Sequence, residues 1–186
     1  MPLPADPVWL ITGCSTGFGR ALAKRVLARG WRVIATARGK DRIADLIALA
    51  PERALAIDLD VTDAAQVRAA VASATERFAR VDVLVNNAGY GYQSSVEEGD
   101  EAEIRAQFDA NVFGLFAMTR AMLPGMRARG SGRIVMNSSV LGLVAAPWRG
   151  AYVSTKFAME GLTDVLRLEM RDTPIRIILI EPGPVA

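Results

Sequence analysis

Short apolar runs alternate with amphipathic helical segments along the whole chain, and this alternation restricts the possible folds more than any other feature. Strands are expected at Val8–Ile11, Trp31–Ala37, Arg53–Asp58, Val81–Asn86, Gly132–Asn137 and Ile175–Ile180. Helices are expected at Ala21–Ala28, Asp41–Ala50, Asp63–Phe78, Glu101–Arg129 and Ala151–Met170. Because alternating strands and helices form right-handed βαβ units, the pattern predicts a single α/β domain over residues 1–186, with helices on both faces of a doubly wound parallel sheet.

Two residues refine the expected helix boundaries. Thr62 precedes the helix at Asp63–Phe78 and belongs to the residue types that cap a helix N-terminus. Pro124 lies inside the long segment Glu101–Arg129 and is expected to bend or interrupt it, because proline has no N–H to donate within a helix.

Composition excludes several classes of protein. Hydrophobic residues make up 51% of the 186 residues, yet no apolar run could span a bilayer, and the first residues do not resemble a signal peptide. No membrane partner is therefore expected. The single cysteine, Cys14, cannot form an internal disulfide, which fits a reducing compartment, so a cytoplasmic protein is expected. The net charge is only +2 and the basic residues are scattered, so no nucleic-acid partner is expected. The absence of histidine excludes histidine-based triads and histidine-ligated zinc, and no metal site is expected.

A glycine-rich turn joins the first strand to the first helix. Gly13, Gly17 and Gly19 all lie in this turn, where backbone N–H groups can approach a phosphate and the positive end of the helix lies beneath it. The spacing differs from the ordinary G-x-G-x-x-G fingerprint, and a purely structural turn is the alternative. Cys14 is interpreted as a small residue that fills the turn rather than as a reactive thiol.

Polar or glycine-rich clusters follow nearly every expected strand. They are Gly13–Gly19, Arg38, Asp60, Asn86–Gly91, Ser138–Ser139 and Pro182–Gly183. In an open parallel sheet, ligands bind beyond the carboxyl ends of the strands, where the strand order reverses. The clusters therefore predict a ligand site along this edge of the sheet.

Tyr152 and Lys156 are four residues apart, so on a helix they share one face. Tyrosine ionises near pH 10 and is a poor base at neutral pH, but a neighbouring ammonium group favours the phenolate. Such a pair also arises by chance on surface helices, and the serines after the fifth strand favour the catalytic interpretation. Either Ser138 or Ser139 can face the same crevice, and these residue types together predict proton transfer at an oxygen.

A series of short motifs then follows the chain in a fixed order. Thr12–Gly19 fits a T-G-x-x-x-G-x-G loop, Asn86–Gly89 reads N-N-A-G, Asn111 lies in a helix, Ser139 precedes Tyr152–Lys156 (Y-x-x-x-K), and Pro182–Gly183 follows the sixth strand. In this order the motifs resemble those of the short-chain dehydrogenase/reductase family. The residues in and around them are most similar to its steroid and retinol dehydrogenase-like branch. The resemblance implies a Rossmann-type, three-layer αβα fold with strand order 3-2-1-4-5-6. It also implies an NAD(P)-dependent enzyme that acts on a CH–OH group.

The resemblance assigns roles to individual residues. Tyr152 would exchange a proton with the substrate oxygen, Lys156 would favour ionised Tyr152 and hold the nicotinamide ribose, Ser139 would position the reacting oxygen, and Asn111 would organise a proton-relaying water. For Asn111 the alternative is a helix-interior side chain that bonds its own backbone. Ser138 would support the loop. The implied cofactor-binding residues are Gly13, Ser15, Thr16, Gly17, Phe18, Gly19, Asp60, Val61, Asn87, Ala88, Gly89, Tyr152, Lys156, Pro182 and Gly183.

The end of the second strand favours NADP(H) over NAD(H). Sites for NAD usually place an acidic residue here to bind the ribose 2′-hydroxyl, but this chain has Ala37 followed by Arg38. A guanidinium can bind a 2′-phosphate through two hydrogen bonds, and Ser15 could add a donor. A merely solvated Arg38 is the alternative interpretation.

Apolar residues near the expected site suggest a hydrophobic ketone or secondary alcohol as substrate. They are Tyr90, Tyr92, Val140, Leu141, Leu143, Val144, Pro147 and Trp148.

The resemblance implies a homodimer or homotetramer, and Phe157, Leu162, Val165 and Leu166 could contribute to its interface. A catalytically silent NADP(H)-binding or redox-sensing module is the alternative function. Family members continue with a substrate-covering loop, helices and a seventh strand, so the domain is expected to be incomplete at its C-terminus, with an exposed sixth strand.

Overall fold

The computed structural model of the chain describes residues 3–184, and its sheet contains the six strands that the sequence predicts. The strands are β1 (Val8–Ile11), β2 (Arg32–Ala37), β3 (Ala54–Asp58), β4 (Val83–Asn86), β5 (Gly132–Asn137) and β6 (Ile175–Ile180). They pair in parallel in the order β3-β2-β1-β4-β5-β6, which confirms the predicted topology. The order reverses between β1 and β4, so a crevice at the carboxyl ends of these two strands is the expected place for a ligand.

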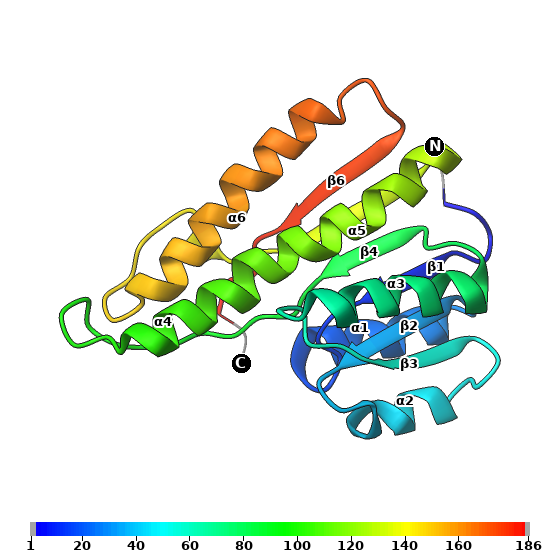
Figure 1. Cartoon of the computed structure of the whole chain (residues 1–186), viewed down its shortest axis with the longest axis horizontal. Helices are drawn as coiled ribbons and strands as arrows, with labels where there is room; N and C mark the ends of the chain where they lie inside the picture. The colour runs from blue at the N-terminus through cyan, green and yellow to red at the C-terminus, as the bar shows by residue number, and fades with distance from the viewer. Residues whose placement is uncertain (1–2, 185–186) are drawn as a thin grey trace.

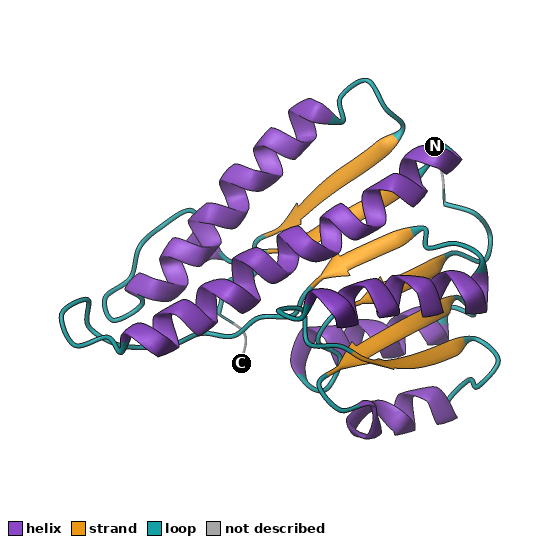
Figure 2. Cartoon of the chain, in the orientation of Figure 1, coloured by secondary structure: helices purple, strands orange, loops and turns teal. Residues whose placement is uncertain are grey.

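Helices cover both faces of the sheet (Figures 1 and 2). They are α1 (Gly17–Ala28), α2 (Ala44–Ala48), α3 (Ala64–Phe78), α4 (Glu101–Phe108), α5 (Gly114–Arg129) and α6 (Gly150–Glu169), with 3-10 turns η1 (Lys40–Ile43) and η3 (Val140–Gly142). Helices α3, α5 and α6 pack on one face and α1 and α2 on the other. The three-layer arrangement is therefore confirmed.

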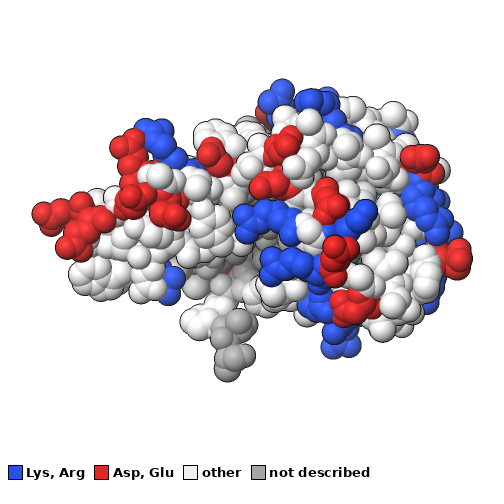
Figure 3. Space-filling view, turned by 60° about the horizontal axis from the view of Figure 1, so that its bottom comes forward, with Lys and Arg blue, Asp and Glu red and all other residues white. Residues whose placement is uncertain are grey.

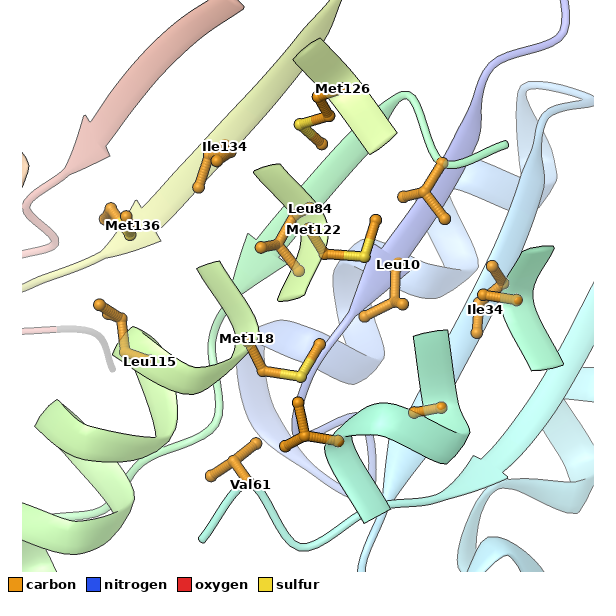
Figure 4. Packing of buried hydrophobic residues seen from close by; sticks show 14 of the residues in the cluster. Leu10, Ile34, Val61, Leu84, Leu115, Met118, Met122, Met126, Ile134 and Met136 are labelled. Carbon is orange, nitrogen blue, oxygen red and sulfur yellow. The ribbon is translucent and has the colours of Figure 1, made fainter. Parts of the chain in front are cut away.

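A methionine-rich face of α5 packs on the centre of the sheet. Met118, Met122 and Met126 are four residues apart, so they form one stripe, and all three are buried against the side of the sheet that carries Leu10 and Leu84 (Figure 4). A second cluster joins α1 and α2 to the opposite face through Ala23, Val26, Leu27, Val33, Ala35 and Leu46. The two clusters fix the strand ends that carry the candidate site.

The first two helices begin and end differently from the sequence-based expectation. Helix α1 begins at Gly17 rather than at Ala21, because the glycine-rich turn itself forms the first turn of the helix. The segment expected as one helix at Asp41–Ala50 consists of η1 followed by the short α2, which ends at Ala48. Both corrections concern local backbone geometry and leave the order of elements unchanged.

Asp63 caps α3, so the prediction that Thr62 is the N-cap is wrong. Asp63 Oδ1 accepts hydrogen bonds from the backbone N–H groups of Ala65 (2.7 Å) and Gln66 (3.1 Å). The hydrogen bond from Gln66 and then that from Ala65 hold the pKa of Asp63 below its usual value. The Thr62 hydroxyl instead donates to Asp60 Oδ1 (2.7 Å). A carboxylate is the stronger cap because it also interacts favourably with the positive end of the helix.

A π-helical segment, Asp109–Phe113 (η2), separates α4 from α5 within the long helical region expected at Glu101–Arg129. The expected interruption at Pro124 is wrong, since α5 continues through this residue to Arg129. A π segment shifts the register of the helix and is often found at functional sites. Here it contains Asn111, whose side chain makes contacts described below.

The surface has one acidic end. Acidic side chains gather where the loop before α4 projects from the molecule, whereas both signs are mixed over the rest of the face in Figure 3. Residues of this end include Glu97, Glu98, Asp100, Glu101 and Glu103. Among residues 3–184, none of the helices combines the length and apolar character needed to cross a membrane, and no group of acidic or cysteine side chains could hold a metal ion.

Strand β6 forms an edge of the sheet, as expected. Ile178 and Ile180 of this strand are more than one third exposed. Both lie on the same side of the strand, because alternate residues of a strand point to the same face. The expected apolar exposure of the sixth strand is therefore present in the described part of the chain.

Candidate functional site

The glycine-rich turn lies against the loop that follows β4, and two of its glycines have no room for a side chain. A Cβ atom added to Gly13 would lie 2.9 Å from Ala88 Cα, and Gly13 also has a φ of +71°, which favours glycine. A Cβ on Gly19 would lie 2.4 Å from Gly13 O and 2.5 Å from Asn87 Nδ2. The close packing explains why glycine is required at positions 13 and 19.

The N-terminus of α1 is open at this turn. Thr16 is the N-cap residue, but its side chain makes no capping hydrogen bond. Thr16, Gly17 and Phe18 are exposed and Ser15 is half-buried. An uncapped helix N-terminus offers backbone N–H groups to an anion, so these residues fit a phosphate.

Cys14 is a small buried residue inside the turn, as the sequence predicts. Its side chain is fully buried and its Sγ donates to the backbone oxygen of Ile11 (3.2 Å). Burial raises the pKa of the Cys14 thiol to about 12. The thiol is therefore unreactive at neutral pH.

Thr12 and Asn87 join the two loops. The Thr12 hydroxyl accepts hydrogen bonds from the backbone N–H groups of Asn87 (2.9 Å) and Ala88 (2.9 Å). Asn87 Nδ2 donates to the backbone oxygens of Thr12 (2.8 Å) and Gly13 (3.1 Å). The predicted residues Asn87 and Ala88 thus lie directly beside the glycine-rich turn, and exposed Gly89 follows them.

The end of β2 carries an exposed cation without a local partner. Arg38 follows buried Ala37 and makes no hydrogen bond or ion pair within residues 3–184. Asp60, after β3, is half-buried and its Oδ1 accepts from the Thr62 backbone N–H (3.0 Å). Val61 is buried against α5, where a Cβ on Gly114 would lie 2.5 Å from its Cγ2.

Tyr152 and Lys156 lie on one face of α6 at the carboxyl ends of the strands. The Lys156 ammonium lies 5.4 Å from the centre of the Tyr152 ring and donates to the backbone oxygen of Asn137 at the end of β5 (2.8 Å). The Tyr152 hydroxyl makes no hydrogen bond within the described residues. Burial lowers the pKa of Lys156 to about 8, and the Glu160 carboxylate opposes part of this change.

The two candidate serines have different surroundings. Ser139 is half-buried at the start of η3, which packs against α6, and its hydroxyl accepts from the Leu141 backbone N–H (3.1 Å). Ser138 is buried and its hydroxyl donates to Glu160. The Ser138 hydroxyl is thus already engaged in a structural contact, whereas the Ser139 hydroxyl retains its proton for another acceptor.

Asn111 is buried in the π segment, and both the oxygen and the nitrogen of its side-chain amide make hydrogen bonds. Its Oδ1 accepts from the Tyr90 backbone N–H (3.0 Å), and its Nδ2 donates to Tyr90 O (2.8 Å) and to Thr155 Oγ1 (3.1 Å). Thr155 Oγ1 in turn donates to the backbone oxygen of Tyr152 (2.7 Å). Asn111 therefore does not bond its own backbone, and it connects the loop after β4 to the helix that carries Tyr152.

The loops at the rim of the site expose apolar side chains. Leu143, Val144 and Trp148 are each more than half exposed, and Trp148 has a φ of +64°, an unusual value for a bulky residue. Pro182, after β6, accepts from the Val140 backbone N–H (2.9 Å), and exposed Gly183 follows it. Because Val140 directly follows Ser139, this hydrogen bond joins the end of β6 to the serine loop.

Several residues of the site are not marked as functional by the sequence pattern. Thr12 is only one position of the glycine-rich motif, and Asn137 is only the end of an expected strand. Yet Asn137 accepts a hydrogen bond from Lys156 through its backbone oxygen and donates one to Asn87 through its side chain (2.9 Å). Thr155 and Glu160 also contact site residues. Two features of the sequence could have indicated them: Asn137 is a polar residue at the end of an otherwise apolar strand, and Glu160 is an acidic residue on the helix face of Tyr152 and Lys156.

The residues present fit a nicotinamide dinucleotide. The open N-terminus of α1 suits a pyrophosphate, the lack of Cβ atoms at Gly13 and Gly19 lets the backbone approach it, and the unpaired Arg38 lies at the next strand end. Tyr152 and Lys156 lie beyond the reversal of strand order between β1 and β4, on the β5 side. Fold and site together define a dinucleotide-binding domain with a tyrosine–lysine pair.

Comparison with known proteins identifies the family. Residues 7–186 match the family model for short chain dehydrogenases, and the chain belongs to this family. Oxidoreductase BOA17 of Botryotinia fuckeliana is 42% identical over 177 residues, which are 95% of this chain and 65% of that protein. Human 17-beta-hydroxysteroid dehydrogenase type 1 is 40% identical over 190 residues, 97% of this chain and 57% of that protein. The chain thus spans about two thirds or less of the length of these relatives.

Solved structures agree with the fold. A short-chain dehydrogenase from Streptomyces avermitilis superposes with a TM-score of 0.95 at 44% identity, covering 98% of this chain and 67% of the other. A family member from Burkholderia phymatum in complex with NAD has a TM-score of 0.94 at 29% identity, covering 100% of this chain and 68% of the other. A serine dehydrogenase complexed with NADP+ has a TM-score of 0.92 at 32% identity, covering 96% and 73%.

Proposed function

We propose that the protein is an NADP(H)-dependent oxidoreductase that interconverts a carbonyl and an alcohol. The observation that carries this proposal is the Tyr152–Lys156 pair beside a turn that fits a dinucleotide, in a chain of the short-chain dehydrogenase family. The nicotinamide supplies or accepts the hydride when it is bound. The test is consumption of NADPH with a panel of hydrophobic ketones, with Tyr152→Phe as the comparison.

Proton transfer is proposed for Tyr152. In reduction its hydroxyl donates a proton to the carbonyl oxygen, and in oxidation the phenolate removes a proton from the alcohol. Lys156, held by Asn137 O, favours ionised Tyr152 and binds the nicotinamide ribose. Ser139 donates a hydrogen bond to the reacting oxygen. Asn111 is proposed to organise a proton-relaying water, and its side chain holds the loop after β4 against α6.

The glycine-rich turn (Gly13, Ser15, Thr16, Gly17, Phe18, Gly19) is proposed to hold the pyrophosphate. Asp60, Val61 and Asn87–Gly89 are proposed to line the adenosine, and Pro182–Gly183 the nicotinamide. The support is their position around the carboxyl ends of neighbouring strands. NADP(H) is preferred to NAD(H) because Ala37 leaves no carboxylate that would repel a 2′-phosphate and Arg38 has no partner within the described residues.

The Arg38→Ala variant is expected to bind NADPH about 10- to 100-fold more weakly, because one charge-assisted contact to a phosphate is worth roughly 1.5–3 kcal/mol. NADH affinity should change little, since NADH has no 2′-phosphate. Fluorescence titration of the variant with each cofactor measures both effects. Equal losses for NADPH and NADH would contradict the proposed contact.

The proposed substrate is a small hydrophobic ketone or secondary alcohol. Exposed Leu143, Val144 and Trp148, in the segment between Ser139 and Tyr152, support this class, and so does the similarity to a relative named for hydroxysteroids. A cytoplasmic location is part of the same proposal, because the only cysteine is a buried free thiol. Binding of NADPH without turnover of any ketone would favour the alternative, a silent NADP(H)-binding module.

A homodimer or homotetramer is proposed, with an apolar face on α5 and α6 as the interface. Phe157, Val165 and Leu168 form an exposed stripe on α6. Phe113, the last residue of η2, and Phe116, in the first turn of α5, are also exposed. Buried Leu166 belongs to the core instead, and half-buried Leu162 packs against it. Because apolar patches of this kind are the usual cores of subunit contacts, Phe157→Glu should halve the mass measured by sedimentation, from dimer to monomer or from tetramer to dimer. An unchanged mass would exclude this face.

A further inference from the structure

Glu160 joins the helix of the tyrosine–lysine pair to the serine loop. It lies on α6 one helical turn beyond Lys156, and Ser138 Oγ donates a hydrogen bond to its Oε1. Ser138 is buried, directly precedes Ser139, and is held to β6 by the bond from its backbone N–H to Ile180 O (2.8 Å). Glu160 therefore contacts the loop at the residue next to the proposed catalytic serine.

The space for this contact depends on Gly142. A Cβ atom at this position would lie 2.6 Å from Glu160 Oε1 and 2.8 Å from Ser138 Oγ, well inside van der Waals contact. Gly142 is the last residue of η3, the 3-10 turn that begins after Ser139. The serine loop is thus shaped to admit a carboxylate beside Ser138.

Glu160 is also the charged group that acts on Lys156. The Lys156 ammonium is buried and its hydrogen-bond partner, the backbone oxygen of Asn137, is neutral. The other elements around α6 carry Glu101, Glu103, Arg105, Asp109, Arg149, Arg176 and Glu181. Tyr152 contacts Lys156 through its ring. Because Lys156 and Glu160 are four residues apart on α6, they share one helix face, and the Glu160 carboxylate raises the pKa of Lys156 against the larger, lowering effect of burial.

We propose that Glu160 is a positioning residue for the reaction, which places a carboxylate on the Lys156 face of α6 and, through Ser138, fixes the loop that carries Ser139. The inference rests on the proposed function, because both partners that Glu160 organises are proposed to act on cofactor and substrate. A merely structural Glu160 would tie α6 to the loop but would leave the titration of Lys156 unchanged.

The test is a direct titration of Lys156 by NMR with ¹³C-labelled lysine. The chain contains only three lysines, Lys24, Lys40 and Lys156, so the side-chain signals can be assigned with one Lys→Arg variant each at positions 24 and 40. In Glu160→Gln the Lys156 midpoint should fall by about half a pH unit or more, because the amide keeps the shape and an acceptor for Ser138 but loses the charge. In Ser138→Ala the carboxylate remains and the midpoint should stay near that of the wild type.

A second variant allows the proposal to be tested even if Glu160→Gln does not fold. Removing both partners of a buried polar contact is often nearly neutral for stability, so Ser138→Ala combined with Glu160→Met should fold even if Glu160→Gln does not. The double variant should show the same downward shift of the Lys156 midpoint. A midpoint equal to that of the wild type in whichever charge-removing variant folds would overturn the proposal. No cofactor or substrate is present in this titration, so its result is independent of whether the chain turns over a ketone.

Discussion

The Tyr152→Phe variant is expected to reduce hydrophobic ketones about 10²- to 10⁴-fold more slowly than the wild type, the usual contribution of a general acid. Phenylalanine keeps the ring beside Lys156 and Gly91, where a Cβ at residue 91 would lie 3.5 Å from Tyr152 Cδ2, so packing should be preserved. The hydroxyl makes no hydrogen bond within residues 3–184, so its removal leaves no buried partner unsatisfied. The loss should therefore be chemical rather than structural.

Steady-state consumption of NADPH measures this effect, and fluorescence titration with NADPH provides the control. The dissociation constant for NADPH should change by less than the rate does, because Lys156 and the glycine-rich turn remain. The melting temperature should match that of the wild type. A variant that retains full activity would show that Tyr152 is not the proton donor. Equal loss of NADPH binding and of turnover would show that the hydroxyl serves the cofactor instead.

Gly19→Ala should have the largest effect on the cofactor site. The added methyl would lie 2.4 Å from Gly13 O, a backbone atom that cannot move without disturbing the turn, and 2.5 Å from Asn87 Nδ2. Overpacking of this kind costs roughly 1–3 kcal/mol of unfolding free energy. It should also abolish detectable NADPH binding, because the same atoms hold the glycine-rich turn against the loop after β4.

Gly125→Ala is the matched control on α5. There a Cβ would lie 3.3 Å from Arg129 Nη1, so the Arg129 side chain, whose Nη2 donates to Val81 O (2.7 Å), must shift slightly. An alanine inside a helix is favoured over glycine by about 1 kcal/mol, which offsets this shift, so the variant should have about the stability of the wild type and bind NADPH normally. Urea unfolding and NADPH titration of the two variants measure the contrast. Unimpaired NADPH binding by Gly19→Ala would contradict the proposed role of the turn.

The alternation of apolar runs and helical segments was sufficient to predict the sheet. All six strands lie where their apolar residues indicated, and the strand order agrees with that implied by the family resemblance. The errors concern helix ends. Asp63 rather than Thr62 caps α3, and the long helical region changes register at Asp109–Phe113 rather than at Pro124. Neighbouring residues with similar capping preferences differ only in backbone angles, which a pattern of residue types does not specify.

Local patterns in the sequence are enough to single out the candidate residues of the site. Glycines at fixed spacing, Tyr152 and Lys156 on one helix face, and a cation after the second strand are properties of local order, because helical periodicity and turn geometry depend on near neighbours. The way in which these loops and helices are held together depends instead on contacts between distant parts of the chain, which local patterns do not reveal. Thr12 bonds to Asn87, 75 residues away, and Ser138 bonds to Glu160, 22 residues away. Such contacts depend on strand register and on how helices pack against the sheet, and these are fixed by the whole core rather than by any single stretch of the chain.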